Sequence, residues 1–193
     1  MAKTTNILIA GVGGQGTVLA AKILSRLLIA KGYDIKVSEI HGMSQRGGSV
    51  VTQVRFGEKV YSPIIEEGAA DYILAFEKLE GIRVLPYLKK GGCLIVNAKE
   101  INPMPVTMGA AEYPQDLESF LNSLDAEVSS FDAYAMALEA GNPKVLNMVL
   151  LGAWAKAFGL DEEEGLKVIR NNVPEKFLKV NEEGFRKGYE SIV

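Results

Sequence analysis

The residues from Gly11 to Gly16 (GVGGQG) follow a short apolar segment and match the pattern G-x-G-x-x-G. Glycines let a backbone approach a phosphate without interference from Cβ atoms, and the free N–H groups of a following helix favour an anion. Glu39 lies about where an acidic residue would bind a ribose hydroxyl. The pattern therefore indicates either a dinucleotide-binding loop or a tight strand-to-helix turn without a ligand. If it binds a cofactor, the expected contacts are Gly11, Gly13, Gly14, Gln15 and Gly16.

A second glycine-bearing loop (HGMSQRGG) precedes Ser49. It brings together a hydroxyl, an amide, a guanidinium and two glycines, from Ser44, Gln45, Arg46, Gly47 and Gly48. Such a loop can offer backbone N–H groups together with the planar fork of an arginine, which suits a phosphate, a carboxylate or the carbonyls of a partner. The alternative is a surface turn in which Arg46 pairs with a nearby carboxylate. We favour binding by these five residues because of where the loop lies in the expected fold.

The elements around the two loops are expected to be a strand, a helix and a strand. Residues 6–10 are a short β-rich segment, residues 15–31 carry apolar side chains at helical spacing, and residues 35–40 form a second strand. Gly32 lies where a helix C-cap is expected. A right-handed parallel crossover is the favoured arrangement of such a unit. Both loops would then project from the same carboxyl edge of the sheet, where ligands bind in open α/β folds.

The segment that follows departs from simple alternation of strands and helices. Residues 49–56 and 59–61 flank Gly57 and Glu58 and indicate a β-hairpin, so the sheet is expected to be mixed. Further strands are expected at 71–76 and 93–96, weaker ones at 106–110 and 126–130, and helices through 79–88 and 116–124.

From residue 131 onward the chain is expected to be helical. Asp161 and Glu164 form a candidate capping box, and Pro174 suits a first helical position. These features predict a single three-layer, Rossmann-like α/β domain with a mostly parallel, mixed sheet. The predicted domain covers residues 1–193, with the sheet core in residues 1–130 and a helical portion in residues 131–193.

Composition and charge argue against several functions. The chain has 193 residues and a net charge of −3, without a cluster of Lys or Arg that would indicate nucleic acid or a membrane surface. One cysteine, Cys93, cannot form an intrachain disulfide or hold an iron–sulfur cluster by itself, and one histidine, His41, argues against a histidine-based zinc site. We interpret Cys93 as an inert buried thiol and His41 as structural. Because no signal peptide or membrane span is apparent, a cytoplasmic protein is expected.

The amino-acid sequences of the two loops resemble those of a known protein family. ILIAGVGGQG (residues 7–16) and EIHGMSQRGGSVVTQVRFG (residues 39–57) are similar to the gamma-type domain shared by pyruvate, 2-oxoglutarate, ketoisovalerate and indolepyruvate ferredoxin oxidoreductases. HGMSQRGGSV is most similar to the indolepyruvate type, in which the equivalent chain is called the beta subunit. The resemblance continues through KVLNMVLLG (residues 144–152) and KVNEEGFRKG (residues 179–188), so it covers nearly the whole chain.

The resemblance implies the oxidative decarboxylation of a 2-oxoacid, with indolepyruvate or a related aryl or branched 2-oxoacid as substrate. Carbon dioxide is lost on thiamine diphosphate, electrons pass through iron–sulfur clusters to ferredoxin, and the acyl group passes to coenzyme A. This chain lacks a cysteine ligand set and a Gly-Asp-Gly segment followed by Asn that could hold the Mg²⁺ of thiamine diphosphate.

We therefore expect an accessory subunit with no catalytic residue, no metal and no cofactor bound by this chain alone, inactive without its partners. Partner subunits would bind, alone or together with this chain, thiamine diphosphate, Mg²⁺, the iron–sulfur clusters and coenzyme A. Ferredoxin would interact with this chain only through the complex. The resemblance implies that the glycine loops either help to close the active site or receive the phosphates of coenzyme A, with Arg46 as the principal side chain.

Two other functions stay open from the sequence. The first glycine loop together with Glu39 fits a stand-alone NAD- or FAD-binding Rossmann-type oxidoreductase. A regulatory or scaffold protein that binds a small anion without catalysis fits the same two loops. Outside the loops, Asn147 is expected to be a hydrogen-bonded core or interface amide. A helical stripe is expected to pack in the core or, second, to dock a partner; it contains Phe177, Asn181, Phe185 and Tyr189.

Overall fold

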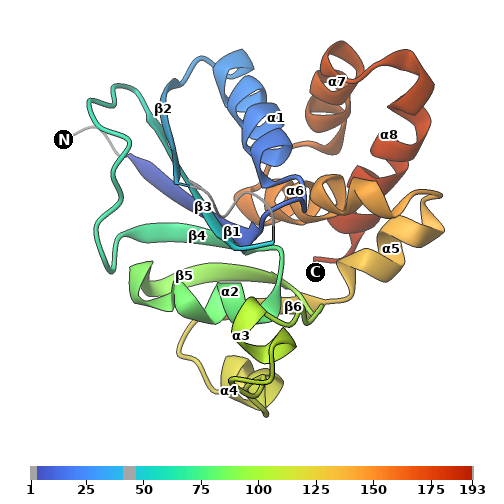
Figure 1. Cartoon of the computed structure of the whole chain (residues 1–193). Coiled ribbons are helices and arrows are strands. Elements are labelled where there is room, and N and C mark those ends of the chain that lie inside the picture. Colours follow the sequence, from blue (N-terminus) through green and yellow to red (C-terminus); the bar gives the residue numbers. More distant parts are fainter. Residues whose placement is uncertain (1–3, 41–46, 193) are drawn as a thin grey trace.

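The structure is a computed structural model and describes residues 4–40 and 47–192. In these residues the sheet has six strands in the order β2-β3-β1-β4-β5-β6 (Figure 1). The pairs β1–β4, β4–β5 and β5–β6 are parallel, whereas β3 is antiparallel to both of its neighbours, so the predicted mixed sheet is confirmed. The strands are β1 (Thr5–Val12), β2 (Asp34–Ile40), β3 (Ser49–Gly57), β4 (Ala70–Ala75), β5 (Leu88–Asn97) and β6 (Glu127–Phe131).

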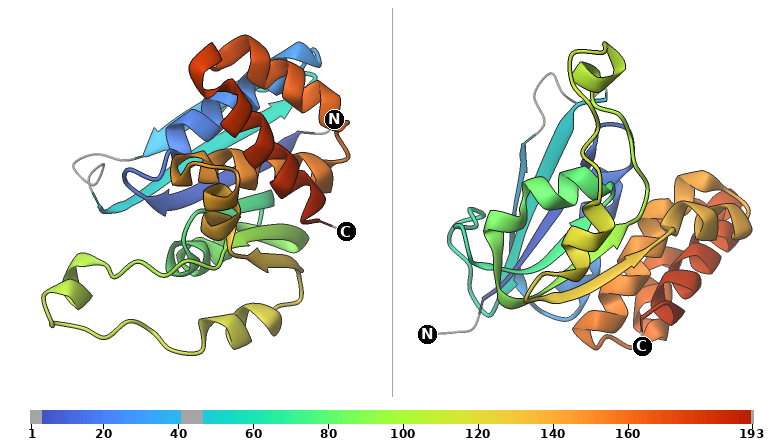
Figure 2. Two further views of the ribbon diagram at one scale, coloured as in Figure 1. Left: turned by 90° about the vertical axis from the view of Figure 1, so that its right-hand side faces the viewer. Right: turned by 90° about the horizontal axis from the view of Figure 1, so that it is seen from below.

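Alternate residues of the central strands enter two apolar clusters, one on each face of the sheet. Along β1, Ile7 and Ile9 join one cluster and Leu8 and Ala10 join the other, as the two-residue period of a strand requires. Helices lie on both sides of the sheet (Figure 2), and the predicted three-layer α/β class is confirmed. The first face is covered mainly by α1 (Thr17–Ala30) and α6 (Leu146–Phe158), and the second by α2 (Lys78–Arg83) and α4 (Leu117–Asn122).

The predicted unit of strand, helix and strand is present as β1–α1–β2, but β3 lies between its two strands. The predicted β-hairpin across Gly57 and Glu58 is wrong, since no strand follows β3 before β4. Because β1 and β2 already occupy both edges of β3, residues 59–61 have no edge left to pair with. These residues are held differently: the Asp34 carboxylate accepts a hydrogen bond from the Val60 N–H at 2.9 Å.

The strand expected at 106–110 is also wrong. This segment contains the short helix α3 (Met104–Thr107) followed by a turn. Pro103 and Pro105 explain the difference, because proline cannot donate to a strand ladder but is well tolerated at the start of a helix. The weaker strand expected at 126–130 is confirmed as β6.

Several helix boundaries differ from expectation by a few residues. The helix expected through 79–88 ends at Arg83, and a 3₁₀ turn, η2 (Leu85–Tyr87), leads directly into β5. At the start of α7 (Glu162–Asn172), Asp161 caps the helix by accepting from the Glu163 N–H at 2.9 Å. The expected capping box is not completed, because the Glu164 carboxylate instead forms an ion pair of 2.6 Å with Lys31.

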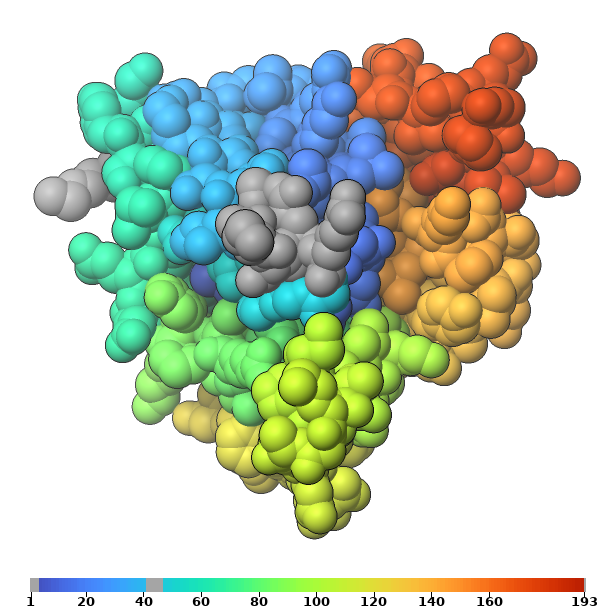
Figure 3. Space-filling model, viewed as in Figure 1, coloured from blue at the N-terminus to red at the C-terminus, as the bar shows by residue number. Residues whose placement is uncertain are grey.

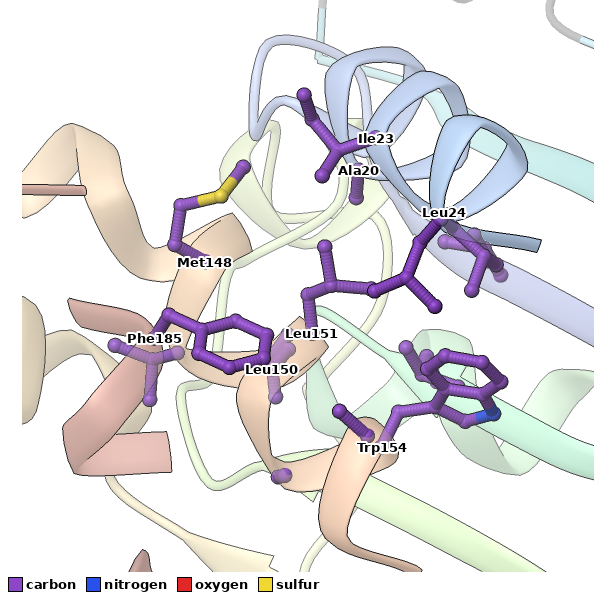
Figure 4. Packing of buried hydrophobic residues seen from close by; sticks show 14 of the residues in the cluster. Ala20, Ile23, Leu24, Met148, Leu150, Leu151, Trp154 and Phe185 are labelled. Carbon is purple, nitrogen blue, oxygen red and sulfur yellow. The ribbon is translucent and has the colours of Figure 1, made fainter. Parts of the chain in front are cut away.

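The C-terminal helices are built around α6, which packs against the sheet and α1 and carries ten buried residues in succession. Leu151 and Trp154 of α6 lie near Leu24 of α1, and Phe185 lies on the other side of α6 (Figure 4). Among the described residues, no helix is both long and apolar enough to cross a membrane. The surrounding helices are α5 (Ala133–Glu139), the 3₁₀ turn η3 (Pro143–Val145), α7 and α8 (Glu175–Glu190).

Helices α6 and α8 approach so closely that glycine is required at their contact. A Cβ atom on Gly188 would collide with the carbonyl group of Val149, and one on Gly152 would collide with the carbonyl group of Phe185. Phe185 and Asn181 are buried, whereas Phe177 is 44% exposed, so most of the stripe on α8 packs in the core as expected. The close packing fixes α8 on α6, which itself packs against the sheet.

Candidate functional site

The two glycine loops lie side by side at one edge of the sheet. The register of β1 with β3 pairs Val12 with Ser49, and the pairing continues into the loops. The Gly13 N–H donates to the Gly48 carbonyl at 2.8 Å, and the Gly47 N–H donates to the Gly13 carbonyl at 3.3 Å. The predicted meeting of the loops is thus confirmed for these residues. The remaining predicted binding residues of the second loop, Ser44, Gln45 and Arg46, lie outside the described residues, as does His41.

Gln15 shapes the first loop through both ends of its side-chain amide. Its Oε1 atom accepts from the Val12 N–H at 2.7 Å, and its Nε2 atom donates to the Phe76 carbonyl at 2.9 Å. The side chain of Gln15 therefore fastens the loop to the ends of β1 and β4. Gly11 has a related role, because a Cβ atom there would lie 2.8 Å from the Cβ of Phe76. Contact of Gln15 and Gly11 with a ligand stays a prediction.

The same edge is stabilised by a second buried amide, which the sequence analysis did not single out. Asn97, fully buried at the end of β5, donates from Nδ2 to the Phe76 carbonyl at 3.0 Å. Its Oδ1 atom accepts from the Ala133 N–H, at the start of α5, at 3.1 Å. Together, Gln15 and Asn97 link the ends of three parallel strands, β1, β4 and β5, and Asn97 also ties the end of β5 to the start of α5. This network holds the backbone of the edge in a fixed shape, as a preorganised binding surface requires.

The start of α1 has N–H groups at this edge that no side chain at the N-cap position accepts. Gly16 is the N-cap residue with φ of +88°, no side-chain cap is present, and the first turn of α1 contains no acidic residue. Gly14 has φ of +101°, and a Cβ atom there would meet no other atom of the described residues within 4 Å. The first N–H groups of a helix have no intrahelical partner and lie at the positive end of the helix dipole. The edge can therefore receive an anionic group.

Two hollows border this edge. The smaller, of about 380 Å³, lies between the first glycine loop and the ends of β2 and β3, and its lining includes Gly13, Thr17, Ile40 and Thr52. The larger, of about 610 Å³, lies between the start of α1, the end of β5 and the start of α6. The larger hollow is lined by Gly14, Gln15, Gly16, Leu19, Lys99, Ile101, Tyr134, Pro143, Lys144, Leu146 and Asn147.

The larger hollow combines positive charge with apolar surface. Lys99 and Lys144 supply two ammonium groups, and the Nζ atom of Lys99 lies 4.8 Å from the centre of the Tyr134 ring. Among the described residues that line the hollow, none is acidic. Leu19 and Tyr134 are both partly exposed and add apolar surface. This arrangement suits a ligand that carries phosphate groups and a planar or apolar part.

Most of these lining residues could not be found from sequence patterns. Lys99, Tyr134 and Lys144 come from three separate segments; Lys99 and Tyr134 belong to no recognisable motif, and Lys144 begins the segment KVLNMVLLG but was not singled out for binding. Asn147 was expected to be a core or interface amide, and it is 2% exposed with its Oδ1 atom accepting from the Met148 N–H at 2.9 Å. Its side chain also packs against Gly16, which places it at the wall of the hollow.

The position of Glu39 disfavours a dinucleotide site of the Rossmann type. In that fold the ribose-binding acid ends the strand next to the glycine loop. Here Glu39 is paired with Thr52 of β3, and β3 separates it from β1. Since neighbouring strands lie about 4.8 Å apart, Glu39 is displaced by a whole strand from the expected place. It lines a different hollow, of about 660 Å³, together with Lys22 and Arg26 of α1.

The Cys93 thiol, which the sequence analysis also considered, is inert. Cys93 is buried in β5, and burial, with a smaller contribution from Glu127, raises the pKa of its thiol to about 12. The thiol is therefore protonated and unreactive at neutral pH, as expected for a structural cysteine. Within residues 4–40 and 47–192, no three His, Cys, Asp or Glu side chains gather in a way that could hold a metal ion.

Comparison with known proteins gives a consistent match along the chain. The family model described as "Pyruvate ferredoxin/flavodoxin oxidoreductase" matches residues 6–191. Indolepyruvate oxidoreductase subunit IorB of Thermococcus kodakarensis is 45% identical over 191 residues, covering 96% of this chain and 95% of that protein. The subunit of the same name from Methanothermobacter thermautotrophicus is 40% identical over 188 residues, covering 95% of each chain.

Solved structures show the same fold. The gamma subunit of the keto/oxoacid ferredoxin oxidoreductase from Geobacter sulfurreducens PCA superposes with a TM-score of 0.71 and 26% identity, covering 97% of both chains. The 2-oxoglutarate:ferredoxin oxidoreductase from Magnetococcus marinus superposes with a TM-score of 0.76 and 21% identity. This chain covers only 31% of that longer chain, while 98% of this chain is matched.

Proposed function

The chain belongs to the pyruvate ferredoxin/flavodoxin oxidoreductase family, and from this premise we propose that it is the accessory subunit of a thiamine-dependent indolepyruvate-type 2-oxoacid:ferredoxin oxidoreductase. The observation that carries the proposal is the 45% identity to an indolepyruvate oxidoreductase subunit over 96% of the chain. Pyruvate and ketoisovalerate oxidoreductase subunits match less strongly, at 26–27% identity. The proposed substrate is therefore indolepyruvate or a related aryl or branched 2-oxoacid.

The residues of this chain do not fit the iron–sulfur clusters or the thiamine diphosphate of such a complex. The chain's single cysteine, Cys93, is buried in the sheet, whereas an iron–sulfur cluster needs about four thiolates. The sequence lacks a Gly-Asp-Gly segment followed by Asn, the motif that would hold the Mg²⁺ of thiamine diphosphate. We place both cofactors on partner subunits and give this chain no catalytic residue. The proposal includes a cytoplasmic location and delivery of electrons to ferredoxin through the partner.

The role we propose for this chain is to hold coenzyme A, the acyl acceptor. Its phosphates would accept hydrogen bonds from the N–H groups at Gly14, Gly16 and the first turn of α1, with Lys99 and Lys144 neutralising their charge. A hollow of about 610 Å³ falls in the range of small-molecule sites. Tyr134 and Leu19 would contact the less polar parts of the same molecule.

The second glycine loop completes the proposed site. Gly47 and Gly48 are joined by hydrogen bonds to the first loop, and Ser44, Gln45 and Arg46 precede them in the sequence. We propose that Arg46 adds a guanidinium fork to the phosphate contacts, since arginine binds phosphate in a bidentate way. The chain would thereby orient coenzyme A toward the thiamine-bound acyl group on the partner and exclude water from the path between them.

Purification of the native complex tests this function. The chain, tagged at its C-terminus and expressed in its source organism, is expected to copurify in fixed proportion with a larger partner that contains thiamine diphosphate and iron. A chain that elutes alone, or with partners that contain neither group, would contradict the proposal. Binding of NAD or FAD by the isolated chain at low micromolar concentration would contradict it as well.

A further inference from the structure

A long excursion leaves the sheet beside the candidate site. Residues 98–116, here called the arm, connect β5 to α4, and they run outward to α3 before returning (Figure 2, left). The arm starts at the carboxyl end of β5, so it projects from the same edge as the glycine loops. In the space-filling view its atoms, in yellow-green, bulge from the lower part of this face (Figure 3).

The outer part of the arm is uncharged and apolar. Residues 101–111 (INPMPVTMGAA) contain no Asp, Glu, Lys or Arg. Met104 is 68% exposed and Met108 is 74% exposed, although methionine is normally among the more buried residues. Methionine is flexible and polarizable, and it is frequent at surfaces that bind partners.

The tip of the arm nevertheless has a defined conformation. Pro103 and Pro105 fix the backbone at the start of α3. The Ala110 N–H donates to the Pro105 carbonyl at 2.8 Å, and Gly109, with φ of +73°, ends the helical turn. A rigid tip loses little conformational entropy when it binds.

The base of the arm is fastened by a buried carboxylate. Glu77, which is 1% exposed, accepts from the Tyr113 hydroxyl at 2.5 Å and from the Ile101 N–H at 3.1 Å. It also caps α2 by accepting from the Glu80 N–H at 2.8 Å. Burial, followed by the hydrogen bond to Glu77, raises the pKa of Tyr113, so its hydroxyl remains a donor at neutral pH. Glu77 thus ties both sides of the arm to the body of the protein.

Lys78 adds a second fastening at the same place. It is 8% exposed, and its Nζ atom lies 3.1 Å from Glu100, near the start of the arm, and 3.3 Å from Glu118, just after the end of the arm. Burial alone lowers the pKa of Lys78, but the hydrogen bonds to the two carboxylates outweigh it and the pKa is raised. The arm is therefore held outward by buried polar contacts, although its tip contacts solvent.

We propose that the arm inserts its tip, with Met104 and Met108, into an apolar recess of the thiamine-binding partner subunit. This inference rests on the proposed function and adds the surface by which the two subunits recognise each other. Lys99 and Ile101, at the root of the arm, line the larger hollow, so a partner that reaches the coenzyme A site must also meet the arm. A second copy of this chain is a poorer occupant, because a stable dimer buries about 800 Å² per partner and the tip of the arm is only one short helical turn.

The test measures the affinity between the full chain and the purified partner subunit. The double variant Met104→Asp and Met108→Asp is expected to raise the Kd at least about tenfold, because both side chains would lose burial in the recess. Tyr61→Asp is the matched control. Tyr61 is 87% exposed, but it precedes β4 and so lies at the opposite edge of the sheet. We therefore expect its Kd for the partner subunit to change by less than about twofold. Unaltered thermal unfolding of the double variant would show that its fold is intact.

A second variant separates the fastening of the arm from its tip. Tyr113→Phe removes the hydroxyl that donates to Glu77 but leaves both methionines in place, and we expect about threefold weaker binding with faster proteolytic cleavage within residues 101–111. Wild-type affinity of the methionine double variant would overturn the arm proposal and leave the proposed function standing. Self-association of the isolated chain that the double variant abolishes would also overturn it, in favour of a second copy. Failure of the wild-type chain to bind the partner at all would overturn the function and the arm proposal together.

Discussion

The main-chain N–H of Gly13 donates a hydrogen bond of 2.8 Å to the carbonyl oxygen of Gly48, and so joins the two glycine loops into one edge. The bond extends the pairing of β1 with β3 beyond Val12 and Ser49. Because the first loop also starts α1, the N–H groups at the start of that helix lie at the same edge as Gly47 and Gly48. The predictions that follow concern the parts that hold this edge and the ligand it is proposed to bind.

Gln15→Ala is expected to lower the free energy of unfolding by about 2 kcal/mol. The variant leaves the Val12 N–H without an acceptor and removes one of the hydrogen bonds that the Phe76 carbonyl accepts. The measurement is urea unfolding at neutral pH. Gln115→Ala is the control, since Gln115 is exposed and its amide only donates to the nearby Tyr113 carbonyl. Equal stability of the two variants would show that Gln15 does not fasten the loop.

Gly188→Ala is expected to cost at least about 3 kcal/mol or to prevent folding, because the added methyl group meets the backbone carbonyl of Val149 and neither helix can yield locally. Thermal unfolding followed by circular dichroism measures the effect. Lys179→Ala, an exposed position on the same helix, is expected to change the stability by less than about 0.5 kcal/mol. A Gly188→Ala protein as stable as the control would contradict the close contact of α6 with α8.

Asp34→Asn is expected to weaken the acid dependence of stability. The hydrogen bond from the Val60 N–H, followed by that from Lys36, lowers the pKa of Asp34 to about 2. A lowered pKa in the folded state adds stability above the unfolded pKa of about 4, and this stability is lost as the pH falls toward 2. The variant should be less stable than the wild type at pH 7, and the two should converge between about pH 4 and 2 in urea unfolding. A constant difference across that range would contradict the shift.

The double variant Lys99→Ala and Lys144→Ala is expected to raise the KM for coenzyme A at least about tenfold in the assembled complex, with little change in the KM for the 2-oxoacid. Each ammonium group is proposed to form a charge-assisted contact with a phosphate, and losing two such contacts weakens binding by at least this factor. Lys90→Ala, exposed near the start of β5 at the opposite edge, is the control. An unchanged KM for coenzyme A would remove the larger hollow from the proposed site.

Local patterns predicted the elements better than their arrangement. The helix that starts after Gly16 and the buried strand around Cys93 could be predicted because apolar spacing reports local structure directly. The insertion of β3 between β1 and β2 could not, because strand order depends on which edges are free, and this information is not local. The same insertion removes Glu39 from the glycine loop and decides against the dinucleotide interpretation.

The candidate site was predictable only where it lies in a motif. The meeting of Gly13 with Gly48 followed from the position of both loops at a carboxyl edge. Lys99, Tyr134 and Lys144 were missed, because they converge only after β5, α5 and α6 have packed together. The error at residues 106–110 has a different cause: the apolar residues were read as a strand, although Pro103 and Pro105 favour the start of a helix.

The most direct test of the central claim is the rate of ferredoxin reduction with indolepyruvate and coenzyme A, measured for the thiamine-binding partner alone, for this chain alone and for the two combined. We predict that neither chain is active alone, that the mixture reduces ferredoxin and forms the acyl-CoA product, and that the rate saturates at equal amounts of the two chains. Full coenzyme A-dependent activity of the partner without this chain, or no gain on adding it, would contradict the claim that this chain is the accessory subunit that holds coenzyme A.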